Sequence, residues 1–155
     1  MPDPKRICAF YSRGPHFMRL LAFLREREPQ AHITAVVPPG YPKALLGNRA
    51  DAVIETAKAQ YAARDLAGIR DLLRTIRAGR FDEFVVMFDS PRLRLLAAFT
   101  GAARRSVFTV DGRCLPLTVS PVAVLVSWLY RSLRGRLTFA YIYCVVHGRP
   151  VERRK

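Results

Sequence analysis

The sequence predicts an α/β fold built on one parallel sheet. Short runs rich in Val, Ile and Phe alternate with amphipathic stretches from Arg6 to Val110, and strands joined by crossover helices produce this alternation. The runs carry few polar residues, which is typical of strands that are covered on both faces. We therefore predict a single Rossmann-like, doubly wound parallel sheet of about five strands, followed by two apolar and basic helices.

The strands and crossover helices follow one another in regular order. The segments that fit strands are residues 7–11, 32–37, 52–55, 83–88 and 106–110. Between them, residues 17–27 place Leu20, Leu21 and Leu24 on one helical face, and residues 64–78 repeat this apolar spacing. A third helix is predicted over residues 92–99, because Ser90 and Pro91 are a typical N-cap and first-turn pair and Gly101 ends the segment.

The composition changes near the end of the predicted sheet. Residues 114–130 carry no formal charge. Prolines shorten the helix expected there to about residues 121–133, below the roughly 17–25 residues that a membrane-spanning helix needs. Residues 137–146 form a second apolar stretch. We therefore expect a Rossmann-like domain over residues 1–113 and a helical extension over residues 114–155.

The extension has the composition of an interfacial membrane anchor, in which aromatic rings lie at headgroup depth and arginines meet lipid phosphates. The residues that fit this role are Trp128, Tyr130, Arg131, Arg134, Arg136, Tyr141 and Tyr143. The apolar residues between them could equally pack on the sheet, on a partner chain or on a second copy forming a homodimer. We expect peripheral contact with anionic lipid at the cytoplasmic face of the plasma membrane.

The charge balance points to an anionic partner. The 155 residues include 26 Lys and Arg against 12 Asp and Glu, a formal net charge of +14. A nucleic-acid adaptor is one alternative, although no recognised nucleic-acid motif supports it. The cysteines Cys8, Cys114 and Cys144 lie far apart, so neither a disulfide framework nor a metal site is indicated. No cofactor is expected, and the N-terminus is interpreted as a first strand.

The loop after the first strand is the leading candidate for ligand binding, because ligands lie beyond the carboxyl ends of strands in open parallel sheets. Ser12, Arg13 and Gly14 lead into a helix whose free N–H groups favour an anion, and Arg13 could add a charge-assisted bond. The loop is neither a GxGxxG nor a GxxxxGK[ST] motif. Capping by Ser12 and a turn at Gly14 explain the same residues equally well.

Further candidates follow the first, fourth and fifth strands. His16, at the start of the first helix, could act as a general base or hydrogen-bond donor. Asp89 ends the fourth strand, where a carboxylate would face the same cleft, although helix capping is slightly favoured. Ser90, Arg92 and Arg113 complete the candidate anion-binding set, Arg113 only if the cleft reaches the turn after the fifth strand.

Three segments resemble the N-terminal half of glycosyltransferases of the ADP-heptose:lipopolysaccharide heptosyltransferase family. They are RICAFYSRGPHFMRLLAFLRERE, AHITAVVPPGY and RAGRFDEFVVMFDSPRLRLLAAFTGAARRSVF, all within residues 6–113. The shared features are a strand followed by a Ser-x-Gly loop, an LRER helix end and an FD-x-x-V strand. The resemblance implies a GT-B architecture, in which this half receives the lipid-linked acceptor and a second Rossmann-like half binds the nucleotide sugar.

The chain departs from the family at two points. Where the family has an Asp just after the loop glycine as catalytic base, this sequence has Pro15 and His16, so the base is either replaced by His16 or absent. Apolar, basic helices are expected where the second half would begin. The resemblance implies a domain of lipopolysaccharide or glycan biosynthesis that binds an anionic glycan or lipid-linked acceptor without a complete active site. Alternatively, a partner chain or second copy supplies the nucleotide-sugar site, with His16 or Asp89 as base.

Overall fold

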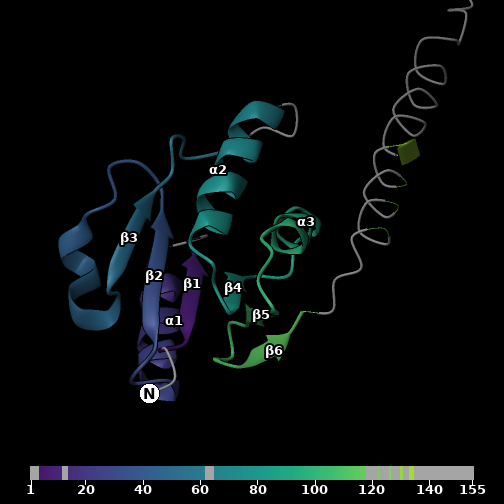
Figure 1. The fold of residues 1–155 in the computed structure, drawn as a ribbon. Helices are drawn as coiled ribbons and strands as arrows, with labels where there is room; N and C mark the ends of the chain where they lie inside the picture. The colour runs from purple at the N-terminus through teal and green to yellow at the C-terminus, as the bar shows by residue number, and fades with distance from the viewer. Residues whose placement is uncertain are drawn as a thin grey trace, which may run out of the picture. The chain divides into compact units, whose positions relative to one another are not determined.

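The computed structural model describes residues 4–11, 14–61 and 65–117, together with the helical positions 122, 126, 130, 133 and 134. The chain divides into two compact units, Met1–Val119 and Ser120–Lys155. The first unit contains the sheet and its covering helices (Figure 1).

The sheet has six strands in the order β3-β2-β1-β4-β5-β6 (Figure 1). Their bounds are β1 Arg6–Phe10, β2 His32–Val37, β3 Ala52–Glu55, β4 Glu83–Met87, β5 Arg104–Phe108 and β6 Cys114–Pro116. The first five strands pair in parallel, with β1 between β2 and β4. The predicted α/β class and doubly wound parallel sheet are therefore confirmed.

The sixth strand differs from the expectation that the segment from residue 114 onward is helical. β6 pairs with β5 in antiparallel register, with Cys114 opposite Phe108. A tight turn makes this return possible, because Gly112 adopts a φ of 81° and its N–H bonds the carbonyl oxygen of Thr109 at 3.0 Å. The boundary expected at residue 113 thus falls inside a β-hairpin, and the sheet continues through residues 114–116.

The helices cover both faces of the sheet (Figure 1). They are α1 Gly14–Arg27, α2 Leu66–Ala78 and α3 Pro91–Phe99, together with the short 3₁₀ segment η1 Lys43–Arg49, which the sequence reading did not anticipate. The apolar residues of α1 pack on Ile7 and Ala9, whereas those of α2 and α3 pack on the opposite side with Cys8 and Val86. Successive residues of one strand thus serve two separate cores, as expected for strands covered on both faces.

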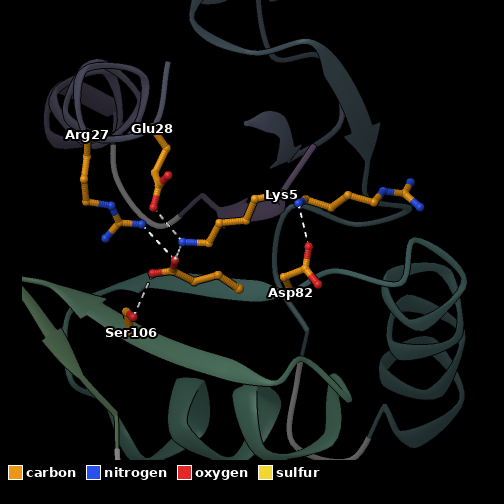
Figure 2. A network of polar contacts seen from close by, with 7 residues as sticks. Lys5, Arg27, Glu28, Asp82 and Ser106 are labelled. Carbon is orange, nitrogen blue, oxygen red and sulfur yellow. Dashed lines mark hydrogen bonds and ion pairs between the residues drawn. The ribbon is translucent and has the colours of Figure 1, made fainter. Parts of the chain in front are cut away.

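A polar network ties the N-terminal ends of the strands together (Figure 2). At its centre Glu83, whose side chain is 4% exposed, accepts hydrogen bonds from Arg27 Nη2 at 2.8 Å and Ser106 Oγ at 3.0 Å. Lys5 Nζ lies 2.9 Å from the same carboxylate and 2.8 Å from Glu28 Oε1. The network joins the end of α1 and the residue before β1 to strands β4 and β5.

Candidate functional site

The strand order places a topological switch point between β1 and β4. From β1 the chain moves outward through β2 and β3, and it then returns to the other side of β1 as β4. Loops that leave neighbouring strands in opposite directions open a crevice beyond their carboxyl ends, which is where open α/β sheets bind ligands. Tyr11 follows β1 and Phe88 follows β4, so the candidate site is assembled from these two loops and the helices after them.

His16 and Phe88 meet across the switch point. Their ring centroids lie 6.3 Å apart with an interplanar angle of 82°, an edge-to-face arrangement. Both residues are half-buried, so one side of the imidazole is fixed by the phenyl ring while part of it stays accessible. The structure therefore brings His16 to the end of β4.

Phe88 has an unusual backbone. Its φ is +68°, in the left-handed region that costs an L-residue roughly 1–2 kcal/mol. The Ser90 N–H donates to the Phe88 carbonyl oxygen at 3.1 Å, which closes a sharp bend between β4 and α3. Strained residues of this kind concentrate at functional sites. The sequence carried no signal for this strain, because a phenylalanine at the end of a buried strand is ordinary.

Asp89 is an ion-pair residue and not the helix cap that the sequence slightly favoured. Ser90 caps α3, since its side chain accepts a hydrogen bond from the Leu93 N–H at 3.2 Å. The Asp89 carboxylate instead accepts two hydrogen bonds from Arg94, one from Nε and one from Nη2. The hydrogen bonds from Arg94 hold the pKa of Asp89 below its usual range, with the charge of Arg94 acting in the same direction. A carboxylate held this way is a poor proton acceptor near neutral pH.

An aromatic cluster lies where the chain leaves β1 and enters α1. Tyr11 makes edge-to-face contacts with Phe17 and with Tyr41, in both cases with ring centroids 5.2 Å apart. The Tyr41 hydroxyl donates to Met18 Sδ at 3.6 Å, and burial raises the pKa of Tyr41. Since Phe17 directly follows His16, this packing fixes the first turn of α1, and with it the imidazole, against the sheet.

No ring contact with His16 or Phe88 is found for the other predicted site residues within the described part of the chain. Gly14 begins α1, whereas Ser12 and Arg13 lie outside the described residues. Arg92 is exposed on the first turn of α3. Arg113 is exposed in the β5–β6 hairpin, where its backbone bonds Thr109. Arg94, which the sequence analysis did not single out, pairs with Asp89 across the start of α3. The sequence signal for this pair was an Asp and an Arg five positions apart on either side of the Ser-Pro pair.

The described part of the C-terminal unit is helical and exposed. Tyr130 and Arg134, two of the predicted interface residues, belong to it. The remaining five, Trp128, Arg131, Arg136, Tyr141 and Tyr143, lie outside the described residues. Among the residues that the structure describes, no helix is long and apolar enough to cross a membrane, and no three His, Cys, Asp or Glu side chains are grouped so that they could hold a metal ion.

Two solved structures share this fold. A glycosyl transferase family 9 protein from Veillonella parvula matches with a TM-score of 0.55 and 22% identity, over 68% of this chain and 32% of that one. ADP-heptose lps heptosyltransferase II from E. coli matches with a TM-score of 0.51 and 22% identity, over 66% and 30% of the two chains. The sequence matches no protein-family model and no curated protein. The chain thus has a heptosyltransferase-like, Rossmann-type fold and spans about a third of the structures it resembles.

Proposed function

We propose that this domain binds an anionic glycan or lipid-linked glycan acceptor at the switch point, as the acceptor half of a glycosyltransferase. The observation that carries the proposal is the meeting of His16 with Phe88 beside Asp89, at the switch point of a sheet with a heptosyltransferase-like fold. One of the similar structures is named for transfer of heptose to lipopolysaccharide. A truncated lipopolysaccharide oligosaccharide is therefore the first ligand class to test.

The residues at the switch point suit such a ligand. The imidazole of His16 can donate to or accept from a sugar hydroxyl. The half-buried ring of Phe88 offers an apolar edge beside it, and the exposed Arg92 supplies positive charge on the first turn of α3. Together they provide one polar contact, one apolar surface and one charge, which is what recognition of a phosphorylated sugar needs.

A second candidate is an active enzyme completed by another chain. The chain spans 32% and 30% of the two similar structures, and in this second proposal a partner or a second copy supplies the nucleotide-sugar site. In that assembly His16 is the better candidate for the base, because both carboxylate oxygens of Asp89 already accept hydrogen bonds from Arg94. Turnover that requires His16 in a reconstituted mixture would establish this reading.

Binding of a heptose-lacking lipopolysaccharide oligosaccharide by calorimetry tests the proposal. His16→Ala is expected to weaken binding about tenfold, the loss of one good hydrogen bond. The matched control is His32→Ala, since His32 begins β2 at the opposite edge of the sheet. Equal affinity in the wild type and His16→Ala, or equal loss in both variants, would overturn the assignment.

We further propose that the C-terminal unit contacts an anionic membrane surface. Its described apolar residues Val122, Val126, Tyr130 and Leu133 are helical and each more than half exposed. Their spacing of four, four and three residues places them within one face of a helix. An apolar helical stripe followed by arginines fits the interface of a bilayer that carries anionic headgroups. A protein partner or a second copy is the alternative occupant.

Co-sedimentation of the full chain with vesicles tests the membrane contact. We expect binding to vesicles that contain phosphatidylglycerol, weaker binding to phosphatidylcholine alone, and a several-fold loss in Val126→Glu. Leu66→Glu is the matched control, because Leu66 is also exposed but lies on α2 of the sheet unit. If Val126→Glu sediments like the wild type, or instead changes the oligomeric state in solution, the stripe is not a membrane surface.

A further inference from the structure

We propose that Arg94 is an oxyanion-binding residue of the switch point and that Asp89 occupies its guanidinium when no ligand is bound. The inference rests on the proposed function, because that function places a ligand at this crevice. It adds the group that recognises the ligand's charge, a phosphate or a carboxylate, and it changes the role of Asp89 from candidate base to internal competitor.

The pairing geometry is that of oxyanion recognition. Arg94 presents its Nε and Nη2 edge, and each of these nitrogens donates to a different oxygen of the Asp89 carboxylate. A guanidinium binds phosphate and carboxylate ligands through the same two-pronged arrangement. Asp89 therefore already shows how an oxyanion is held at this position.

The pair is open to exchange. The side chains of Arg94 and Asp89 are 43% and 45% exposed, so a ligand can reach them without any opening of the core. Exposed ion pairs are weak because water and salt screen them. Of the five N–H groups of a guanidinium, two donate to Asp89, and no other acceptor for the Arg94 guanidinium is found within the described ranges. The Arg94 guanidinium can therefore donate hydrogen bonds to a ligand oxygen, either beside Asp89 or in its place.

The local fold places the pair after the carboxyl end of β4. Asp89 directly follows Phe88, whose ring contacts His16. The Arg94 N–H donates to the Ser90 carbonyl oxygen at 2.9 Å, so Arg94 lies one turn into a helix that Ser90 caps. The bend at Phe88 and the capped first turn of α3 thus hold both partners at the carboxyl end of β4.

A second Asp–Arg pair in the same unit serves as an internal control. Asp71 and Arg74 lie on α2, with 3.5 Å between Asp71 Oδ1 and Arg74 Nη1, and both side chains are exposed. Asp71→Asn therefore makes the same change in net charge as Asp89→Asn and also releases an arginine, but on the outer surface of a helix. A gain in anion binding that is specific to Asp89→Asn cannot come from overall charge.

Phosphate titrations of the full chain, followed by the arginine Nε–Hε resonances, test the inference. We expect Asp89→Asn to bind inorganic phosphate about fivefold more tightly than the wild type. Asp71→Asn should change the affinity less than twofold, and Asp89→Asn combined with Arg94→Gln should lose the gain. Equal gains in the two Asn variants, or a gain that survives Arg94→Gln, would overturn the inference.

Acetate and a sugar phosphate, titrated in the same way, distinguish the two ligand chemistries. A preference of Asp89→Asn for sugar phosphate over acetate assigns the site to phosphate esters, and the reverse assigns it to carboxylates. Failure of the inference is separable from failure of the proposed function. If His16→Ala loses oligosaccharide binding but Asp89→Asn gains no phosphate affinity, only the proposed role of Arg94 is disproved. If Asp89→Asn gains phosphate affinity but the protein binds no oligosaccharide, only the proposed glycan ligand is disproved.

Discussion

Replacement of Glu83 by Gln is expected to lower the free energy of unfolding by about 2 kcal/mol, because it removes a buried negative charge that accepts hydrogen bonds from two partly buried cations. The Glu83 side chain is 4% exposed, and it is the shared acceptor for Lys5 and Arg27 at 2.9 and 2.8 Å. Urea denaturation at pH 7 measures the loss. Asp71→Asn, which removes an exposed ion pair, should change stability by no more than about 0.5 kcal/mol.

The pH dependence of this difference has a definite sign. Burial alone would raise the pKa of Glu83, but the hydrogen bond from Lys5, the charge of Arg27 and the hydrogen bond from Ser106 outweigh it and lower the pKa. The stabilisation is therefore fully present above the pKa of an unfolded-chain glutamate, roughly 4.3, and is lost as pH falls through the lower pKa of the folded protein. Wild type and Glu83→Gln should converge in strong acid. A difference that stays constant with pH would mean that Glu83 is not charged in the folded protein.

Replacement of Phe17 by Ala is expected to cost about 3–5 kcal/mol of stability. Phe17 is fully buried between the sheet and the first turn of α1, and its ring contacts Tyr11 and Tyr41 at centroid distances of 5.2 and 6.4 Å. Thermal and urea unfolding measure the loss. Phe99→Ala is the control, since Phe99 is 41% exposed at the end of α3 and should cost much less.

The same substitution also tests how the site is supported. Phe17 follows His16 and anchors the helix turn that carries the imidazole, so Phe17→Leu, which keeps most of the buried volume, should stay folded yet weaken oligosaccharide binding. Binding unchanged in Phe17→Leu would show that the aromatic cluster stabilises the fold without positioning His16. A loss in Phe17→Ala no larger than that in Phe99→Ala would contradict the core position itself.

Sequence periodicity predicted the elements whose residues are buried in a regular pattern. Leu20, Leu21 and Leu24 repeat along α1 because one helical face is buried, and the predicted bounds of β2 and β3 agree with the observed ones. The strand at Arg104–Phe108 begins two residues earlier than predicted. Its first residues, Arg104 and Arg105, are charged. Because strands are predicted from runs of apolar residues, a strand that starts with two charged residues is predicted to begin too late.

Features that depend on tertiary packing could not be read in the same way. Antiparallel β6 has only three residues, one of them a proline, so it carries almost no strand signal. The strain at Phe88 and the two-pronged pairing of Asp89 with Arg94 arise from how β4 turns into α3. In the sequence, Glu83 is a polar residue at the start of a predicted strand. Its ion pairs with Lys5 and Arg27 could not be predicted, because the tertiary fold brings these residues together.

Backbone amide NMR during titration with the oligosaccharide locates the glycan-binding site on the domain. We expect a heptose-lacking lipopolysaccharide oligosaccharide to shift the resonances of Tyr11, His16 and Phe88, at the carboxyl ends of β1 and β4, and to leave those of Lys5 and His32 at the opposite edge unchanged. Shifts centred on the opposite edge, or no saturable shifts at any residue, would contradict the assignment of the switch point as a glycan-binding site.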